Sequence, residues 1–311
     1  MEFLYFLQSI RCPLLDTIFS LLTHLGEETA FMAIGMIVFW CVSKYQGYYL
    51  LCVGFVGTVI NQFLKITCRI PRPWVKDPNF PIVEAARAEA TGYSFPSGHT
   101  QTSIGLYGGI ARTAKHRVLR ITMIALCLLV PFSRLYLGVH TPADVLTSVV
   151  IALLLVFTLY PLFQKAQSSP RILYIILGGF LILISLFLGF VALYPFPDEV
   201  YAPDAIQNLQ SAQKNAATLF GCAVGLLLAY TADVKWIHFD TRAVWWAQII
   251  KAVGGLGLVL AAKELLRTPL ELLLGNVLVA RGARYFLVVV VGGILWPLTF
   301  RFFAGLGKKD S

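Results

Sequence analysis

The sequence is short of charged residues. Only 13% of its 311 residues are charged, whereas soluble domains have about 25%. Hydrophobic residues make up 58% of the chain, above the roughly 45–50% of soluble domains. These proportions exclude an ordinary water-soluble protein and predict a polytopic membrane protein.

The sequence also lacks grouped cysteines and glycosylation sequons. Its six cysteines form no C-x-x-C pair and no cluster with histidine at metal-ligand spacing. We interpret them as small hydrophobic residues inside membrane segments. The absence of any N-x-S/T sequon favours a bacterial plasma membrane. The endoplasmic reticulum is the alternative, because Lys308-Lys309 resembles a dilysine retrieval signal.

Apolar runs predict an all-α membrane protein with about nine spans. The expected spans are 28–43, 47–68, 99–114, 118–137, 142–163, 172–194, 214–234, 243–266 and 284–304. Residues 1–27 are too polar for a free span and suit an interfacial or partly embedded helix. Four prolines between residues 69 and 95 argue against a helix throughout that loop.

Basic residues predict how the chain crosses the membrane. The linker 112–120 holds four of them and is the densest basic connection, so the positive-inside rule makes its side cytoplasmic. Alternation then places the N-terminus outside and the C-terminus inside. Three polar blocks, at 65–73, 96–99 and 133–144, fall on the non-cytoplasmic side. Topology therefore accounts for the net charge of +9, and we expect no nucleic-acid partner.

The first block pairs two cations. Lys65 ends the second expected span, and Arg72 follows between two prolines that restrict its backbone. A lysine point charge beside a forked guanidinium suits an anion with several oxygens, such as phosphate. Snorkelling of interfacial cations is the alternative.

The second block, Pro96-Ser97-Gly98-His99, opens the third expected span. Proline favours a helix start, glycine allows close approach of a ligand, and free N–H groups there attract anions. Ser97 adds a hydroxyl, and His99 adds a group that donates a proton near neutral pH. A simple capped helix start is the alternative.

The third block combines Arg134, at the end of the fourth expected span, with His140 and Asp144. Residues 141–144 predict a helix cap and first turn, where a carboxylate is favoured. From there Asp144 can reach one nitrogen of His140 and raise the basicity of the other. A histidine with a carboxylate four residues on, beside two other polar blocks, indicates a nucleophile or a base.

Together the blocks define a specific pattern. Its positions are Lys65, Arg72, Pro73, Pro96, Ser97, Gly98, His99, Ser133, Arg134, His140 and Asp144. Over about residues 28–163 the chain closely resembles the type 2 phosphatidic acid phosphatase superfamily, integral membrane phosphatases that include lipid phosphate phosphatases and glucose-6-phosphatase. The resemblance implies a six-helix phosphatase core, which we place within residues 28–194. The additional C-terminal transmembrane helices expected in residues 195–311 exceed that core and depart from the family's pattern.

The resemblance also implies roles for the site residues. His140 would attack phosphorus to give a phosphohistidine, Asp144 would orient it, and His99 would protonate the leaving oxygen. The phosphoryl group would be cradled by Lys65, Arg72, Ser97, Gly98 and Arg134. We expect no metal and no other cofactor, because the three cations can supply the electrostatic stabilisation.

The expected function is hydrolysis of a lipid phosphate or pyrophosphate, isoprenoid, glycerolipid or sphingoid, at the extracytoplasmic membrane face. One alternative is a lipid-linked phosphotransferase with the same intermediate. Another is a non-catalytic lipid transporter or scaffold, which the additional spans in residues 195–311 suggest. The substrate and the oligomeric state stay open. Lys251, inside the eighth expected span, indicates a second substrate or lipid site in the C-terminal bundle, and snorkelling of its side chain is the alternative.

The orientation can be tested by labelling. A cysteine introduced into the 74–95 loop of a variant without native cysteines should react with an impermeant reagent in intact cells. A cysteine in the 112–120 linker of the same background is the control and should react only after lysis. The reverse pattern would overturn the predicted orientation.

Overall fold

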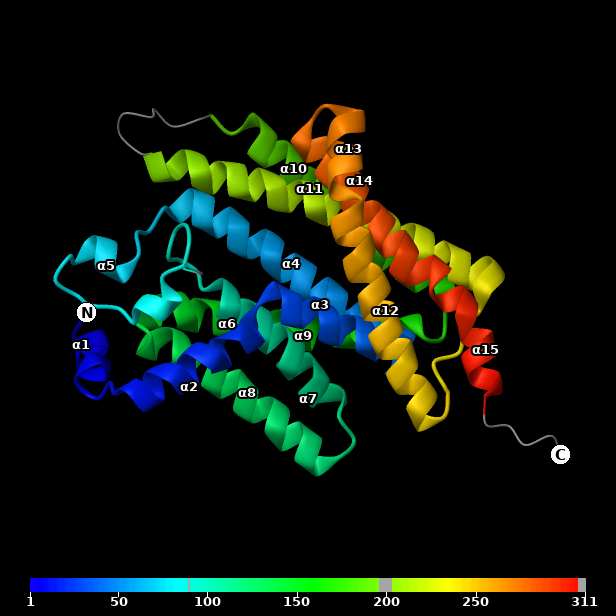
Figure 1. The fold of residues 1–311 in the computed structure, drawn as a ribbon, viewed down its shortest axis with the longest axis horizontal. Coiled ribbons are helices and arrows are strands. Elements are labelled where there is room, and N and C mark those ends of the chain that lie inside the picture. The colour runs from blue at the N-terminus through cyan, green and yellow to red at the C-terminus, as the bar shows by residue number, and fades with distance from the viewer. Residues whose placement is uncertain (89, 196–202, 307–311) are drawn as a thin grey trace. The chain divides into compact units, whose positions relative to one another are not determined.

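The computed structural model describes residues 1–88, 90–195 and 203–306 and is built from helices, with no strand in that part of the chain. In chain order the α-helices are α1 (Glu2–Ser9), α2 (Pro13–Thr23), α3 (Glu28–Ile37), α4 (Lys44–Cys68), α5 (Pro73–Lys76), α6 (Gly98–Ser103), α7 (Gly109–Thr113), α8 (Arg117–Tyr136), α9 (Pro142–Ala166), α10 (Pro170–Leu193), α11 (Pro203–Ala232), α12 (Trp245–Leu265), α13 (Arg267–Leu274), α14 (Val277–Val290) and α15 (Phe300–Gly305) (Figure 1). Short π-helical segments continue several of them, as at Ile104–Gly108 between α6 and α7.

Helices lie at all nine positions where spans were expected, which confirms the helical membrane architecture. Six are long and apolar enough to cross a bilayer, and a pair bent by 55°, Pro13–Gly26 with Glu28–Val42, raises the number to seven among the described residues. The helical run from Gly98 to Thr113 is about 24 Å long at 1.5 Å per residue, shorter than a hydrocarbon core of about 30 Å. The run from Gly98 to Thr113 is therefore not among the candidate membrane spans. Helix α12 is not among them either.

The N-terminal segment is more divided than the single helix expected for residues 1–27. Pro13 occupies the first position of α2, where proline starts a helix because it needs no N–H partner. The chain therefore forms α1, then α2, then a 3₁₀ turn at His24–Gly26.

Two compact units make up the chain. Unit 1 comprises Met1–Met32, Leu50–Tyr160 and Pro195–Gln210, and unit 2 comprises Ala33–Tyr49, Pro161–Tyr194 and Ser211–Ser311. Unit 1 contains all three polar blocks. The sequence predicts a different division, into residues 1–27, 28–194 and 195–311, and this division stays a prediction.

In unit 1 the loop between α5 and α6 is held by apolar packing. Phe80 is 2% exposed and clusters with Leu4 and Ile82. A second cluster joins Ala86 and Ala90 to the end of α8. Leu4 of α1 packs against Phe80 and keeps that ring from solvent. The N-terminal helix thus braces the loop that leads into the second block.

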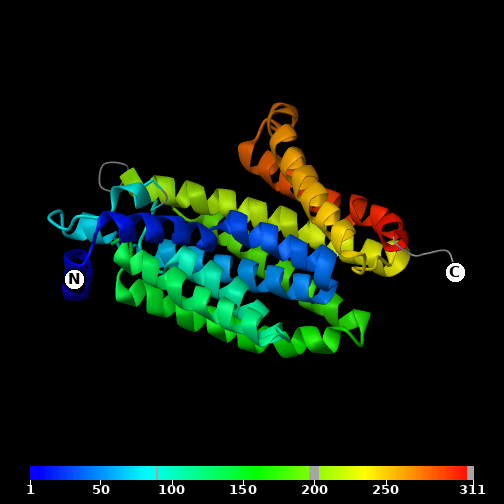
Figure 2. The ribbon, with the colours of Figure 1, turned by 60° about the horizontal axis from the view of Figure 1, so that its bottom comes forward.

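In unit 2 helices α11 and α14 approach each other closely. A Cβ atom on Gly221 would lie 2.0 Å from the carbonyl oxygen of Gly282, so only glycine fits this crossing. Ala217 and Gly225 continue the small-residue stripe on α11, a pattern that lets membrane helices pack backbone to backbone. The chain from α12 through α13 into α14 is drawn in orange tones in Figures 1 and 2.

Lys251 on α12 does not snorkel to a surface. It is 0% exposed, its Nζ donates to the carbonyl of Thr241 at 3.0 Å, and it lies 4.2 Å from the ring centroid of Phe300. Its ammonium group is therefore occupied inside unit 2.

Candidate active site

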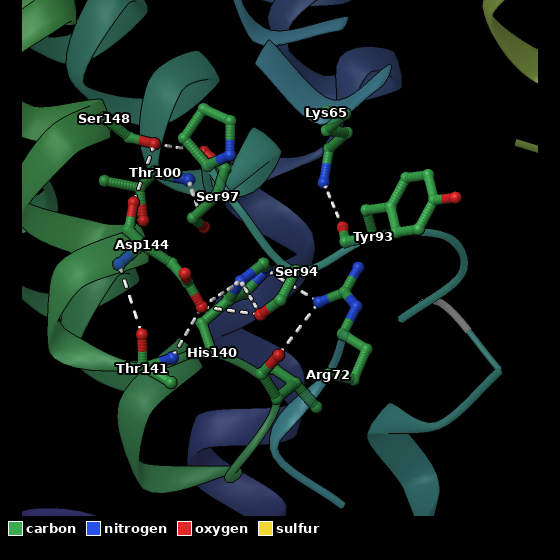
Figure 3. Close-up of polar contacts among 12 residues, drawn as sticks. Lys65, Arg72, Tyr93, Ser94, Ser97, Thr100, His140, Thr141, Asp144 and Ser148 are labelled. Carbon is green, nitrogen blue, oxygen red and sulfur yellow. Dashed lines mark hydrogen bonds and ion pairs between the residues drawn. The ribbon is translucent and has the colours of Figure 1, made fainter. Parts of the chain in front are cut away.

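The three polar blocks meet within unit 1, at the ends of α4, α6 and α9 (Figure 3). Lys65 comes from the last turn of α4, and Arg72 immediately precedes α5. Ser97 caps α6, while His140 lies in the turn before α9. Residues that are far apart in sequence therefore share one buried polar cluster.

Arg72 and His140 form the central contact of this cluster. Nη1 of Arg72 lies 2.9 Å from Nε2 of His140, and both side chains are buried. A guanidinium only donates hydrogen bonds, so Nε2 accepts, and we assign its proton to Nδ1 from this contact. The imidazole therefore presents an unprotonated Nε2 toward the cation.

Asp144 closes the first turn of α9. Its Oδ2 accepts a hydrogen bond from the Thr141 backbone N–H at 2.7 Å, and the Thr141 hydroxyl accepts one from the Asp144 N–H at 3.3 Å. This reciprocal arrangement is a capping box with aspartate at the third position, and it confirms the predicted cap. The same Oδ2 is 3.5 Å from Nδ1 of His140, longer than an ordinary hydrogen bond.

Ser94, which no sequence pattern singled out, bridges this gap. Its buried hydroxyl donates to Asp144 Oδ2 at 2.5 Å and lies 3.5 Å from His140 Nδ1. Its backbone N–H donates to the carbonyl of Ile70 at 2.8 Å, which fixes its position. A serine two residues before Pro96 is a weak signal, because nothing in the spacing indicates that its hydroxyl turns toward α9.

Three successive carbonyls of the loop accept hydrogen bonds from the two cations of the first block. Arg72 donates from Nη2 to Thr91 at 2.7 Å and from Nε to Gly92 at 3.0 Å. Lys65 donates from Nζ to Tyr93 at 2.5 Å. Gly92 has φ +69°, a left-handed conformation that glycine adopts without strain. The cations thus point at one short segment of backbone.

Ser97 confirms the predicted helix start at the second block. Its Oγ accepts from the Thr100 N–H at 3.4 Å, and its carbonyl accepts from the Ser148 hydroxyl at 2.9 Å. A Cβ atom on Gly98 would meet no described heavy atom nearer than 4.0 Å. The backbone at Gly98 is therefore open to close approach by another group.

The remaining predicted residues lie on the same cluster. Arg134 is fully buried near the end of α8, and its Nη1 donates to the Thr23 hydroxyl at 2.6 Å. His99 is half-buried in the first turn of α6. Arg134, Lys65 and His99 all act electrostatically on His140. Unit 1 therefore brings together the residues that the sequence singled out.

The surroundings of His140 favour its neutral form. Burial lowers the pKa of His140 well below its ordinary value, and the positive charges of Arg72, Arg134 and Lys65 lower it further. A neutral imidazole whose unprotonated nitrogen faces a cation can act as a nucleophile toward an electrophile that binds the same cation.

Comparisons with known families agree with the motif pattern. A model of the PAP2 superfamily matches residues 45–168, which contain all three blocks. A second model, described as PAP2 superfamily phosphatase, transmembrane extension, matches residues 217–309. No solved structure gives a significant match.

Curated relatives are similar to part of the chain. A probable sphingosine-1-phosphate phosphatase of Dictyostelium discoideum is 34% identical over 47% of this chain and 38% of its own. Undecaprenyl-diphosphatase BcrC of Bacillus subtilis (strain 168) is 33% identical over 34% of this chain and 52% of its own. Phosphatidylglycerophosphatase B of the same organism is 29% identical over 48% of this chain and 75% of its own. The chain thus spans about half or less of the first two relatives.

Acid should destabilise the protein partly through His140. Below pH 6.5 the unfolded chain binds a proton at this histidine, whereas the folded protein keeps it neutral because its pKa is lowered. Stability should therefore fall as the pH drops from 7 to 5, by up to about 1.4 kcal/mol per pH unit from this group. Thermal unfolding in detergent should show a smaller loss for His140→Gln. Equal losses in the two proteins would contradict the assignment.

Proposed function

Because the chain belongs to the PAP2 superfamily, we propose that it is a metal-independent phosphatase that hydrolyses a lipid phosphate or diphosphate through a phosphohistidine. The observation that supports this best is the 2.9 Å contact between Arg72 Nη1 and His140 Nε2. Phosphoryl oxygens bound to Arg72 would place phosphorus next to the nucleophilic nitrogen.

In the first step, Nε2 of His140 attacks phosphorus, and the bond from phosphorus to the leaving oxygen breaks. His99, which becomes protonated once the anionic substrate binds among the cations, donates its proton to that oxygen, so the leaving group departs as an alcohol, or as a lipid monophosphate when the substrate is a diphosphate. The phosphorylated imidazole keeps its proton on Nδ1. The Ser94 hydroxyl and the Asp144 carboxylate stabilise the positive ring, because both lie 3.5 Å from Nδ1.

In the second step, water attacks the phosphohistidine. His99, now unprotonated, takes a proton from that water, and the bond from phosphorus to Nε2 breaks. Phosphate leaves, His140 returns to its neutral form, and His99 regains its proton. Atoms and protons therefore balance over the two steps.

Charge stabilisation is assigned to the three cations of the cluster. Lys65 and Arg72 now donate to carbonyls of residues 91–93, and phosphoryl oxygens would replace these carbonyls as acceptors. Arg134 adds a third buried positive charge. Preorganised cations in a water-poor site stabilise the transition state strongly, so they can take the place of a metal ion.

The substrate class and the membrane face complete the proposal. The relatives' names refer to a sphingoid phosphate, an isoprenoid diphosphate and a glycerolipid phosphate, so we propose a lipid whose tail stays in the bilayer. The basic linker 112–120 and the site lie at opposite ends of α8, whose 20 residues span about 30 Å. This placement supports an extracytoplasmic site.

Phosphate release in detergent tests the function. The protein should release phosphate from at least one member of a panel of isoprenoid diphosphate, phosphatidic acid and sphingoid phosphate. Activity should survive a chelator and should be inhibited by vanadate, with His140→Ala as the inactive control. Strict dependence on Mg²⁺ would contradict the charge argument. Transfer of a labelled phosphoryl group to an alcohol instead of water would identify a phosphotransferase. Absence of phosphate release from every lipid of the panel would favour a transporter.

Ser94 should act through Asp144. Loss of its hydrogen bond to a carboxylate should lower kcat by about 10-fold to 100-fold with little change in KM, whereas Asp144→Asn should lower kcat by roughly 10²–10⁴. Because Ser94 and Asp144 share one function, Ser94→Ala should lower kcat much less in the Asp144→Asn variant than in the wild type. Ser148→Ala is the control, since that hydroxyl contacts only backbone carbonyls. An equal fall in kcat in the wild type and in the Asp144→Asn variant would show that Ser94 acts independently of Asp144.

The two histidines should respond differently to the leaving group. Protonation of the leaving oxygen contributes typically 10²–10⁴-fold and matters most for a poor leaving group. His99→Ala should therefore lose far more activity on an alkyl lipid phosphate than on p-nitrophenyl phosphate. His140→Ala should be inactive on both. Residual activity of His140→Ala on the activated ester, with His99→Ala equally impaired on both substrates, would reverse the assignment.

A further inference from the structure

Two arginines lie inside a transmembrane segment of unit 2 and take no part in the proposed chemistry. Arg281 and Arg284 belong to α14, within the candidate span Val277–Gly305. They are three residues apart, so they lie on neighbouring faces of one helix. A charged residue at this depth is costly unless it is paired, and it commonly marks a functional site.

Arg284 is buried, and no carboxylate of the described part of the chain pairs with it. It is 7% exposed and lies on the buried face of α14 with Ala280 and Val288. Its Nε is buried and has no hydrogen-bond partner among residues 1–88, 90–195 and 203–306. Its guanidinium lies 5.3 Å from the ring centroid of Tyr285, a contact of about 0.5–2 kcal/mol. That attraction is small against the cost of burying an uncompensated charge.

Arg281 is anchored to α11, one turn away from a further basic residue. Its Nε donates to the Thr218 hydroxyl of α11 at 2.7 Å, and that hydroxyl donates to the carbonyl of Lys214 at 2.9 Å. Lys214 and Thr218 are four residues apart and share a face of α11. The close crossing at Gly282 lies between the two arginines, so the packing of α11 on α14 fixes the basic groups on one helix pair.

The carboxylates of unit 2 whose side chains are described do not neutralise these arginines. Each one whose side chain is described has a basic neighbour of its own: Asp233 pairs with Lys44, Asp240 with Arg242, Glu264 with Lys263 and Glu271 with Arg267. No ion pair within the described residues reaches Arg281 or Arg284. The compensating negative charge must therefore come from outside this part of the protein.

We propose that Arg281 and Arg284, with Lys214 beside them, bind the phosphate of an anionic membrane phospholipid. Guanidinium groups match phosphate oxygens in bidentate geometry, and basic sites between transmembrane helices bind anionic headgroups. Arg281 lies four residues into α14, about 6 Å from its start, so its long side chain can reach the headgroups at that end of the span. Val277 and Val279 are 57% and 56% exposed on the same helix, so an acyl chain can lie against them. A lipid fits these surroundings better than a free anion.

Thermal unfolding of the delipidated full-length protein in detergent tests this site. The probes are dioleoylphosphatidylglycerol, dioleoylphosphatidylcholine and inorganic phosphate, added separately. The variants are Arg284→Met, which keeps the bulk of the side chain, and Arg281→Gln. Arg267→Met is the matched control, because Arg267 lies on α13 of the same unit and already pairs with exposed Glu271.

Phosphatidylglycerol should raise Tm by several degrees in the wild type and in Arg267→Met, and phosphatidylcholine should not. Both site variants should need at least tenfold more phosphatidylglycerol for the same shift. Without lipid, Arg284→Met should be at least as stable as the wild type, because an uncompensated buried charge has been removed. If Arg284→Met does not fold, Arg281→Gln and the number of lipids retained in native mass spectrometry decide the question.

Equal responses of the wild type and both site variants to phosphatidylglycerol would overturn the proposal. An equal response to phosphatidylcholine would show that the lipid effect is not a charge effect, and it would overturn it as well. A shift with inorganic phosphate as large as that with phosphatidylglycerol would identify a free-anion site and overturn the assignment to a lipid.

Discussion

The hydrogen bond from Arg72 to Nε2 of His140 decides how this site can react. Arginine cannot accept a hydrogen bond, so Nε2 must, and the proton of the neutral ring lies on Nδ1. That proton faces Ser94 and Asp144. The guanidinium is also fixed by carbonyls of Thr91, Gly92 and Val139. One buried contact thus couples the first block, the loop and the turn before α9.

Local patterns made much of this site predictable from the sequence. The helix start at Ser97 and the capping box between Thr141 and Asp144 depend on residues three positions apart, and such short-range rules are readable from spacing. The positions of the helices were also predictable, because apolar runs are a local feature of the sequence. The motif positions in the three blocks belong to a superfamily whose model matches residues 45–168, although their individual roles stay predictions.

The parts that could not be predicted depend on contacts between distant residues. Ser94 reaches Asp144 across 50 positions of sequence, and Thr23 reaches Arg134 across 111. Phe80 is covered by Leu4 of α1, 76 positions away in sequence. Lys251 attracted attention as an isolated charge, yet its ammonium group donates to Thr241 and lies over Phe300, whereas the buried Nε of Arg284 has no hydrogen-bond partner among the described residues. Such differences arise from tertiary packing, and single-residue patterns do not encode them.

Identification of the covalent intermediate tests the central claim most directly. The protein would be mixed with substrate, quenched within milliseconds under alkaline denaturing conditions that preserve phosphohistidine, and digested for mass spectrometry. The account predicts a phosphoryl group on Nε2 of His140, present during turnover and absent after the substrate is consumed. A phosphoryl group on any other residue, or turnover at the wild-type rate by His140→Ala, would contradict it.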